Sequence, residues 1–194
     1  MGAKEAERPF LEKVTEYLVS LPFDLKILQE AVTDPDLDRT AREIAAGTIV
    51  HTISPQAEGE GPLRFADDVL FVRAALARVV SDGSEGATAF KERFAGEVYE
   101  KLDADCGLFA DYLGELWPWL VGRLDSFGKI PYKGKKPSQY VDDEEAATLL
   151  YEEGLEFQTN YNLSEEQVRN KVRRADQILE LINKKRAEEA KKRS

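Results

Sequence analysis

Apolar residues recur every three or four positions along almost the whole chain. The segment from Phe65 to Val79 shows this spacing, and so does the longer segment from Phe90 to Leu124. Such a repeat is typical of helices with one buried face, and no stretch alternates apolar and polar residues as a half-buried strand would. The pattern predicts an all-α protein, a multi-helix globular bundle.

Prolines and glycines divide this pattern into the expected helices. A first helix is predicted from Pro9 to Pro22, followed by a short second helix over residues 25–32, because proline suits a first turn and interrupts a helix interior. Pro118 predicts a kink or break within residues 90–124. Glycines are costly inside a helix, so close approach of a neighbouring helix is expected at Gly107, Gly114 and Gly122.

A hydrophobic hairpin is expected near the middle of the chain. Residues 44–53 are almost wholly apolar on every side, which implies burial of the helix over about residues 38–53. A Gly-rich break over residues 56–62 separates it from the helix over residues 65–79. The two helices are predicted to pack antiparallel, with Gly47 permitting close contact.

The order of features in this region resembles a known family. A charged loop at residues 34–38 precedes the first hydrophobic helix, which ends in Ser54-Pro55, and the pair Asp67-Asp68 opens the second. This order, over about residues 34–80, resembles the YkvA-like domain family, DUF1232, of unknown function. The resemblance implies a central helical hairpin and brings no established chemistry. Residues 56–61 depart from the apolar and acidic run usual in that family, which removes one potential ligand group.

The C-terminal third has a different organisation. Residues 128–140, rich in Gly, Pro and Lys, are interpreted as a linker between a helical core at residues 1–127 and a C-terminal helical region at residues 141–194. Ser164 and Gln167 have the spacing of a capping box. An amphipathic helix follows, whose apolar stripe is Val168, Val172, Ala175, Leu179 and Ile182. Residues 183–194 lose the stripe and are expected to form a frayed, solvated helix end.

Charge and composition limit the classes of function. The net charge is −10, but residues 161–194 hold ten Lys and Arg against six Asp and Glu, an excess of +4 that leaves −14 for the rest. An acidic body disfavours nucleic acid, while the basic tail is compatible with an anionic membrane surface. The single cysteine, the absence of an apolar run of about 20 residues and the polar N-terminus predict a cytoplasmic protein without a transmembrane segment.

Two interpretations exist for the one histidine and the Asp pair. His51 can be a packed core histidine, which we favour, or a metal ligand or general base completed by Asp67 and Asp68 across the hairpin. The two carboxylates can bind a cation, but their place in the first turn of a helix favours structural capping. No Ser–His–Asp order, phosphate-binding loop or dinucleotide fingerprint is present. Neither a cofactor nor a metal is therefore expected.

Aromatic residues suggest a partner surface. Trp117 and Trp119 flank Pro118, and only one of two such neighbours can lie on a given helix face, so one is expected to be exposed. Exposed tryptophan favours partner binding. The alternative is a hydrophobic lid beneath the linker, and both interpretations stay open.

The leading hypothesis is a non-enzymatic, cytoplasmic protein-interaction protein that binds a protein partner or itself. Its C-terminal amphipathic helix is expected to dock, and its partner-binding candidates are Trp117, Trp119, Val168, Val172, Leu179 and Ile182. One alternative is a peripheral membrane protein that uses the basic tail and the hydrophobicity of residues 44–53. The other is a metal-dependent enzyme centred on His51, Asp67 and Asp68.

Overall fold

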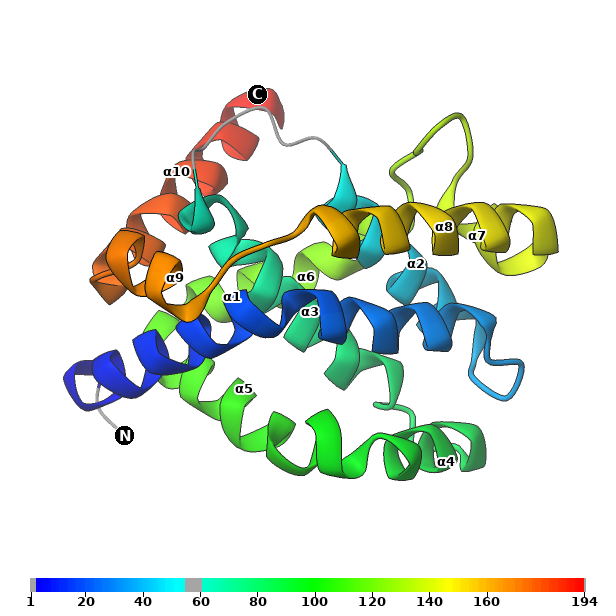
Figure 1. Ribbon diagram of the computed structural model, residues 1–194, viewed down its shortest axis with the longest axis horizontal. Helices are drawn as coiled ribbons and strands as arrows, with labels where there is room; N and C mark the ends of the chain where they lie inside the picture. Colours follow the sequence, from blue (N-terminus) through cyan, green and yellow to red (C-terminus); the bar gives the residue numbers. More distant parts are fainter. Residues whose placement is uncertain (1–2, 55–60, 194) are drawn as a thin grey trace.

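A computed structural model describes residues 3–54 and 61–193, and it confirms the all-α fold (Figure 1). The elements are α1 (Ala3–Thr33), α2 (Arg39–Ile53), η1 (Pro62–Phe65), α3 (Ala66–Val79), α4 (Glu85–Arg93), η2 (Ala95–Tyr99), α5 (Glu100–Leu113), α6 (Leu116–Phe127), α7 (Pro137–Asp142), α8 (Glu144–Asn160), α9 (Glu165–Lys171) and α10 (Ala175–Arg193). Here η1 is a 3₁₀ turn and η2 a π-helical turn. None of the described helices is long and apolar enough to cross a membrane.

Helix α1 is the centre of the bundle. It packs against α2, α3, α5 and each helix from α7 to α10. The prediction of two helices separated by Pro22 is wrong, because α1 runs unbroken through both Pro9 and Pro22. Leu18 and Leu21 on one side of Pro22, and Leu25 on the other, are fully buried, so an unbroken helix keeps one continuous apolar face in the core.

A side chain outside α1 replaces the backbone hydrogen bond that Pro22 cannot make. A proline inside a helix cannot donate to the carbonyl four residues earlier, which here is that of Leu18. The hydroxyl of Tyr161, just beyond α8, donates a hydrogen bond to the Leu18 carbonyl oxygen. The orphaned acceptor is therefore satisfied by a side chain 143 residues away in sequence.

The expected hairpin is formed by α2 and α3. Asp38 caps α2 by accepting a hydrogen bond from the Thr40 amide at 2.8 Å, and the helix ends at Ser54. His51 near the end of α2 lies beside Asp68 at the start of α3, so the two helices are antiparallel. Ile49 and Val50 are fully buried in the core, as are most residues of α3. Pro55 and the first part of the expected loop, residues 56–60, lie outside the described residues.

Glycines act differently from the prediction. Gly47 does permit a close contact, but with α6 rather than with α3, because a Cβ there would lie 2.7 Å from the Phe127 carbonyl carbon. No atom would crowd a Cβ at Gly107, Gly114 or Gly122, so the expected close approaches are absent there. The break between α5 and α6 falls at Gly114, whose φ is +54°, and Pro118 sits in the first turn of α6. Proline is tolerated in a first turn because the amide it lacks would be unpaired there.

Residues 128–142 contain a tight turn and the short helix α7. Tyr132 and Lys135 exchange backbone hydrogen bonds, and the buried Tyr140 donates its hydroxyl to the Tyr132 carbonyl at 2.7 Å. Helix α7 packs against α2 and α8. This segment therefore lies against the bundle and holds the start of α8 in place.

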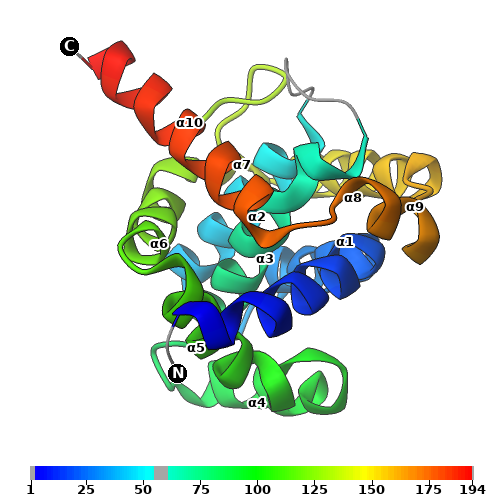
Figure 2. The ribbon, with the colours of Figure 1, turned by 90° about the vertical axis from the view of Figure 1, so that its left-hand side faces the viewer.

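The C-terminal helices α9 and α10 pack against α1. Ser164 and Gln167 form the predicted capping box of α9. Val168, Val172, Ala175 and Ile182 are buried as the stripe predicted, but the backbone breaks between α9 and α10, which buries Ile178 and leaves Leu179 half-buried. The expectation of a frayed end after residue 182 is wrong. Helix α10 continues to Arg193, contacts α3 and α6 through Lys185 and Glu189, and projects from the bundle only at its C-terminal end (Figure 2).

The two classes of glycine give a prediction with opposite signs. Gly47→Ala places a methyl group against the backbone of Phe127, so we expect the free energy of unfolding to fall by about 1–3 kcal/mol. Gly122→Ala meets no neighbour and gains helix propensity, so we expect a rise of up to about 1 kcal/mol. Chemical denaturation of both variants checks this. Two changes of the same sign would contradict the assigned packing of Gly47.

Candidate functional site

The mouth of the hairpin gathers four titratable side chains, here called the mouth cluster: His51, Asp67, Asp68 and Lys185. His51 comes from the last turn of α2, the two aspartates from the first turn of α3, and Lys185 from the middle of α10. One ligand atom from each of His51, Asp67 and Asp68 lies within 4.8 Å of the other two. The structure thus brings together the three residues that the sequence singled out.

The histidine is held by aromatic packing. Its ring stacks on Phe127 at a centroid distance of 4.2 Å and meets the edge of Phe71 at 5.2 Å. Its Nε2 atom lies 3.5 Å from Asp68 Oδ1. Burial, together with the positive charges of Arg123 and Lys185, lowers the pKa of His51 to about 3. The ring is therefore neutral at physiological pH and carries a lone pair on one nitrogen.

The two aspartates are not exposed helix caps. Asp67 is 1% exposed and Asp68 is fully buried, and the N-cap position of α3 is Phe65, which offers no side-chain hydrogen bond. Asp67 Oδ2 accepts a hydrogen bond from Lys185 Nζ at 2.6 Å. Asp67 Oδ1 is also buried, and no described residue donates a hydrogen bond to it.

Lys185 is the member of the cluster that the sequence interpretation missed. Its charge places it with the solvated tail, yet its side chain is only 25% exposed. A signal is present in the sequence, because Lys185 and Glu189 continue the spacing of the buried Ile178 and Ile182 along the same face of α10. Glu189 forms an ion pair with Arg123 of α6 at 2.5 Å. The apolar stripe of α10 therefore continues as a charged one.

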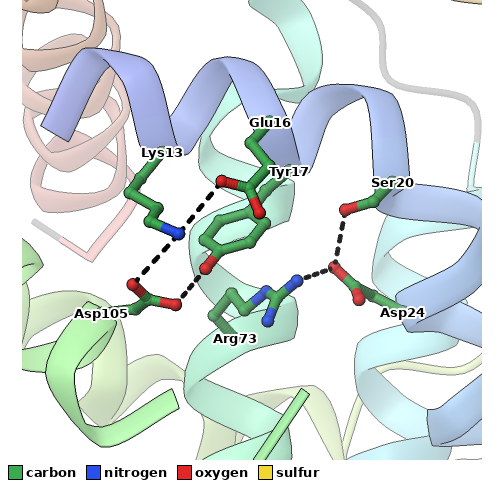
Figure 3. Close-up of polar contacts among 7 residues, drawn as sticks. All are labelled: Lys13, Glu16, Tyr17, Ser20, Asp24, Arg73 and Asp105. Carbon is green, nitrogen blue, oxygen red and sulfur yellow. Dashed lines mark hydrogen bonds and ion pairs between the residues drawn. The ribbon is translucent and has the colours of Figure 1, made fainter. Parts of the chain in front are cut away.

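A second polar cluster lies inside the bundle, between α1, α3 and α5 (Figure 3). Arg73 donates to Asp24 at 2.7 Å, and its guanidinium carbon lies 3.5 Å from the centroid of the Tyr17 ring. Tyr17 in turn donates its hydroxyl to Asp105, which Lys13 approaches at 3.7 Å. These contacts join three helices through buried polar groups.

The charge states in this inner cluster follow from burial. Burial raises the pKa of Asp24 to about 6, against the opposing influence of Arg73. Burial also raises the pKa of Tyr17, so its hydroxyl stays protonated and acts as a donor. Near neutral pH the cluster therefore contains a buried ion pair between Arg73 and Asp24 that is fixed by the tyrosine ring.

The sequence also indicates the inner cluster, through helical register rather than through a motif. Tyr17 and Asp24 lie in register with Val14, Leu21 and Leu28, and Arg73 lies in register with Val69 and Leu76. A charged residue at a core-facing position must be paired inside the protein. Helical register alone therefore indicates which polar side chains are buried.

The predicted partner-binding residues are mostly turned inward. Val168, Val172 and Ile182 are buried in the core of their own chain, and Leu179 is half-buried. Both tryptophans are half-buried, Trp117 against Phe109 and Trp119 beneath Arg123. Cys106 is half-buried, and burial raises the pKa of its thiol to about 12, so it is protonated and unreactive.

Comparisons with known proteins give no identification. No protein-family model matches the chain, and neither a curated protein nor a solved structure does. The likeness to the YkvA-like family therefore stays a prediction that rests on its motifs.

The Lys185–Asp67 ion pair gives a stability prediction. Lys185→Met leaves a buried carboxylate without its cation, so we expect the free energy of unfolding to fall by roughly 2 kcal/mol, less than for a fully buried pair because Lys185 is partly exposed. Lys184→Met is the matched control, since Lys184 is 64% exposed and pairs within its own helix. Urea denaturation compares the two. An equal loss in both variants would contradict the anchoring role of Lys185.

A second prediction concerns pH and Asp24. The folded protein holds the Asp24 proton up to about pH 6, whereas the unfolded chain releases it near 3.8. Between these pH values the folded state binds more protons, so Asp24 makes the protein lose stability as the pH rises, by about 1.4 kcal/mol per pH unit at most. Asp24→Asn cannot titrate. We expect the stability advantage of the parent over this variant to shrink from pH 4 to pH 6 and stay constant above; a constant difference throughout would contradict the raised pKa.

Proposed function

We propose that this chain is a non-enzymatic, cytoplasmic interaction protein that binds a protein partner along the face formed by α1 and α8. The observation that carries the proposal is that, among the described residues, four of the five large exposed hydrophobic side chains lie on these two helices; the fifth, Ile130, follows α6. Val19 and Phe23 lie one turn apart on α1, and Tyr151 and Leu155 lie one turn apart on α8. They are between 38% and 45% exposed, and Phe23 is the most exposed.

The two helices are antiparallel neighbours. Gln29 of α1 donates to the Tyr151 carbonyl at 3.0 Å and accepts from Gln158, while Tyr161 reaches back to Leu18. Figure 1 shows α1 and α8 side by side on one side of the bundle. Single exposed hydrophobic residues are scattered over ordinary protein surfaces. Exposed hydrophobic residues that are grouped on adjacent helices are instead typical of a partner-binding surface.

The charged residues next to this face indicate what kind of partner would bind there. A hollow of about 490 Å³ adjoins Tyr151 and is lined by Val32, Arg42 and the acidic residues Asp142, Asp143 and Glu144. The body of the protein is strongly acidic. An apolar surface bordered by lysine and arginine is the best complement, because opposite charges steer association and exclude wrong partners.

The burial of residues 44–53 argues against the peripheral-membrane alternative. Residues 44–53 are the membrane-contacting segment that this alternative requires, but Ile44, Ile49 and Val50 pack inside the core. The basic tail alone would provide only a salt-sensitive attraction to anionic lipid. The α1–α8 face therefore has better support than a lipid surface.

Photo-cross-linking in the native host tests this proposal. A benzophenone amino acid at position 23 should give a discrete cross-linked product, as should one at position 155, because both side chains point away from the core. Position 125 on α6 is the matched control, since Asp125 is 68% exposed and α6 lies behind the bundle in Figure 1.

Each outcome identifies a different situation. A product that contains a second polypeptide supports the proposal, and a product with a second copy of this chain identifies self-association. Phe23→Asp should abolish the product formed from position 155 while changing the free energy of unfolding by no more than about 0.5 kcal/mol, as for other surface substitutions. Equal products from positions 23 and 125, or none from 23 and 155, would overturn the proposal.

A further inference from the structure

The mouth cluster contains potential metal-ligand atoms, and at least one of them is not used in a hydrogen bond within the fold. One imidazole nitrogen and two carboxylates converge, and both carboxylates are buried. Asp67 Oδ1 is buried without a hydrogen bond from any described residue. A buried acceptor of this kind costs free energy, so an added cation that it binds would stabilise the protein.

We propose that His51, Asp67 and Asp68 form a binding site for a divalent transition-metal ion of the Zn²⁺ type, in which Lys185 serves as the competing resident cation. This inference does not depend on the partner-binding function proposed above. It concerns binding alone and assigns no reaction to the site.

The spacing of the donors is close to that of a metal site. Zinc lies about 2.0–2.2 Å from nitrogen and oxygen ligands, so two ligands of a tetrahedral site are about 3.4 Å apart. His51 Nε2 and Asp68 Oδ1 are 3.5 Å apart, which fits directly. No separation in the set exceeds 4.8 Å, so a tetrahedral site requires a contraction of at most about 1.4 Å.

The orientation of the histidine ring suits a ligand. Zinc binds imidazole nitrogen, and His51 Nε2 faces the Asp68 carboxylate at 3.5 Å. Its stacking on Phe127 fixes the plane of the ring, which reduces the entropy lost on coordination. The side chain keeps 17% exposure, so the cluster borders solvent at this point.

Charge explains why an ion and Lys185 would exclude one another. Asp67, Asp68, Lys185 and the nearby pair Arg123 and Glu189 together carry one net negative charge. A divalent ion in place of the Lys185 ammonium makes this group neutral. Both cations need the Asp67 carboxylate, so an ion that binds there displaces the Lys185 side chain.

The mixture of donors selects the class of ion. One imidazole with two carboxylates suits zinc and its first-row neighbours, whereas Mg²⁺ and Ca²⁺ prefer sites built from oxygen alone. Three protein ligands also leave a position for water, which is the pattern of an open rather than a closed zinc site.

The test is titration calorimetry of the full chain with Zn²⁺, and with Mg²⁺ as the comparison ion. We expect one Zn²⁺ per chain and no response to Mg²⁺. Lys185→Met should bind Zn²⁺ at least tenfold more tightly than the parent, because the competitor is gone. Asp67→Asn, Asp68→Asn and His51→Gln should each weaken binding at least tenfold. Asp103→Asn, an exposed carboxylate on α5, should leave it unchanged.

Thermal denaturation with and without Zn²⁺ provides a second test if one of these variants folds poorly. Zn²⁺ should raise the melting temperature of Lys185→Met and leave that of the double variant with Asp67→Asn unchanged. Hydrogen exchange of residues 183–190 should increase in the parent when Zn²⁺ binds, because the Lys185 contact is broken. No Zn²⁺ binding by parent and Lys185→Met, binding that survives Asp67→Asn, or an equal response to Mg²⁺ would overturn the site. Binding with unchanged exchange in α10 would overturn the competition with Lys185.

Discussion

The fold depends on the continuity of α1. This helix contacts most of the others, so a break at Pro22 would divide the core. A proline inside a helix costs about 3 kcal/mol, and two features offset that cost here. Apolar side chains on both sides of Pro22 are buried, and the Tyr161 hydroxyl satisfies the Leu18 carbonyl that the proline leaves without a donor. The connection between α8 and α9 therefore stabilises a helix that is formed from the other end of the chain.

Two buried polar clusters lie at different places in the bundle. The inner cluster, with Arg73 and Asp24, fixes how α1 and α3 lie relative to each other, since a shift of either helix would leave a buried charge without its partner. The mouth cluster joins α10 to the hairpin through Lys185 and Asp67. Buried ion pairs add little net stability compared with apolar packing, but they penalise alternative arrangements strongly. In both clusters the polar contacts are therefore best understood as determinants of helix position.

The sequence predicted the parts of this structure that depend on local periodicity. The helical fold, the α2–α3 hairpin and the capping box at Ser164 all follow from spacing and propensity. The failures share a cause. The local effect of Pro22 predicts a break, and the compensating donor at Tyr161 lies too far away in sequence to be found by pattern. The charge of Lys185 suggests a solvated tail, although its spacing from Ile182 places it on the buried face. The glycines show the same limit, since Gly47 meets a neighbouring helix and Gly107 does not, although nothing local in the sequence distinguishes them.

Neighbouring basic residues of α10 differ in how strongly dissolved salt screens their charges. Lys184 and Arg186 are exposed, so dissolved ions screen their fields within about 10 Å at ordinary ionic strength. Lys185, one residue from each, points at a carboxylate that is 1% exposed, where screening by salt is much weaker. A change in ionic strength therefore alters the electrostatic field at the outer face of α10 while it barely changes the contact that holds the helix in place. The attachment of the helix and the field at its outer face are in this way set independently by neighbouring residues.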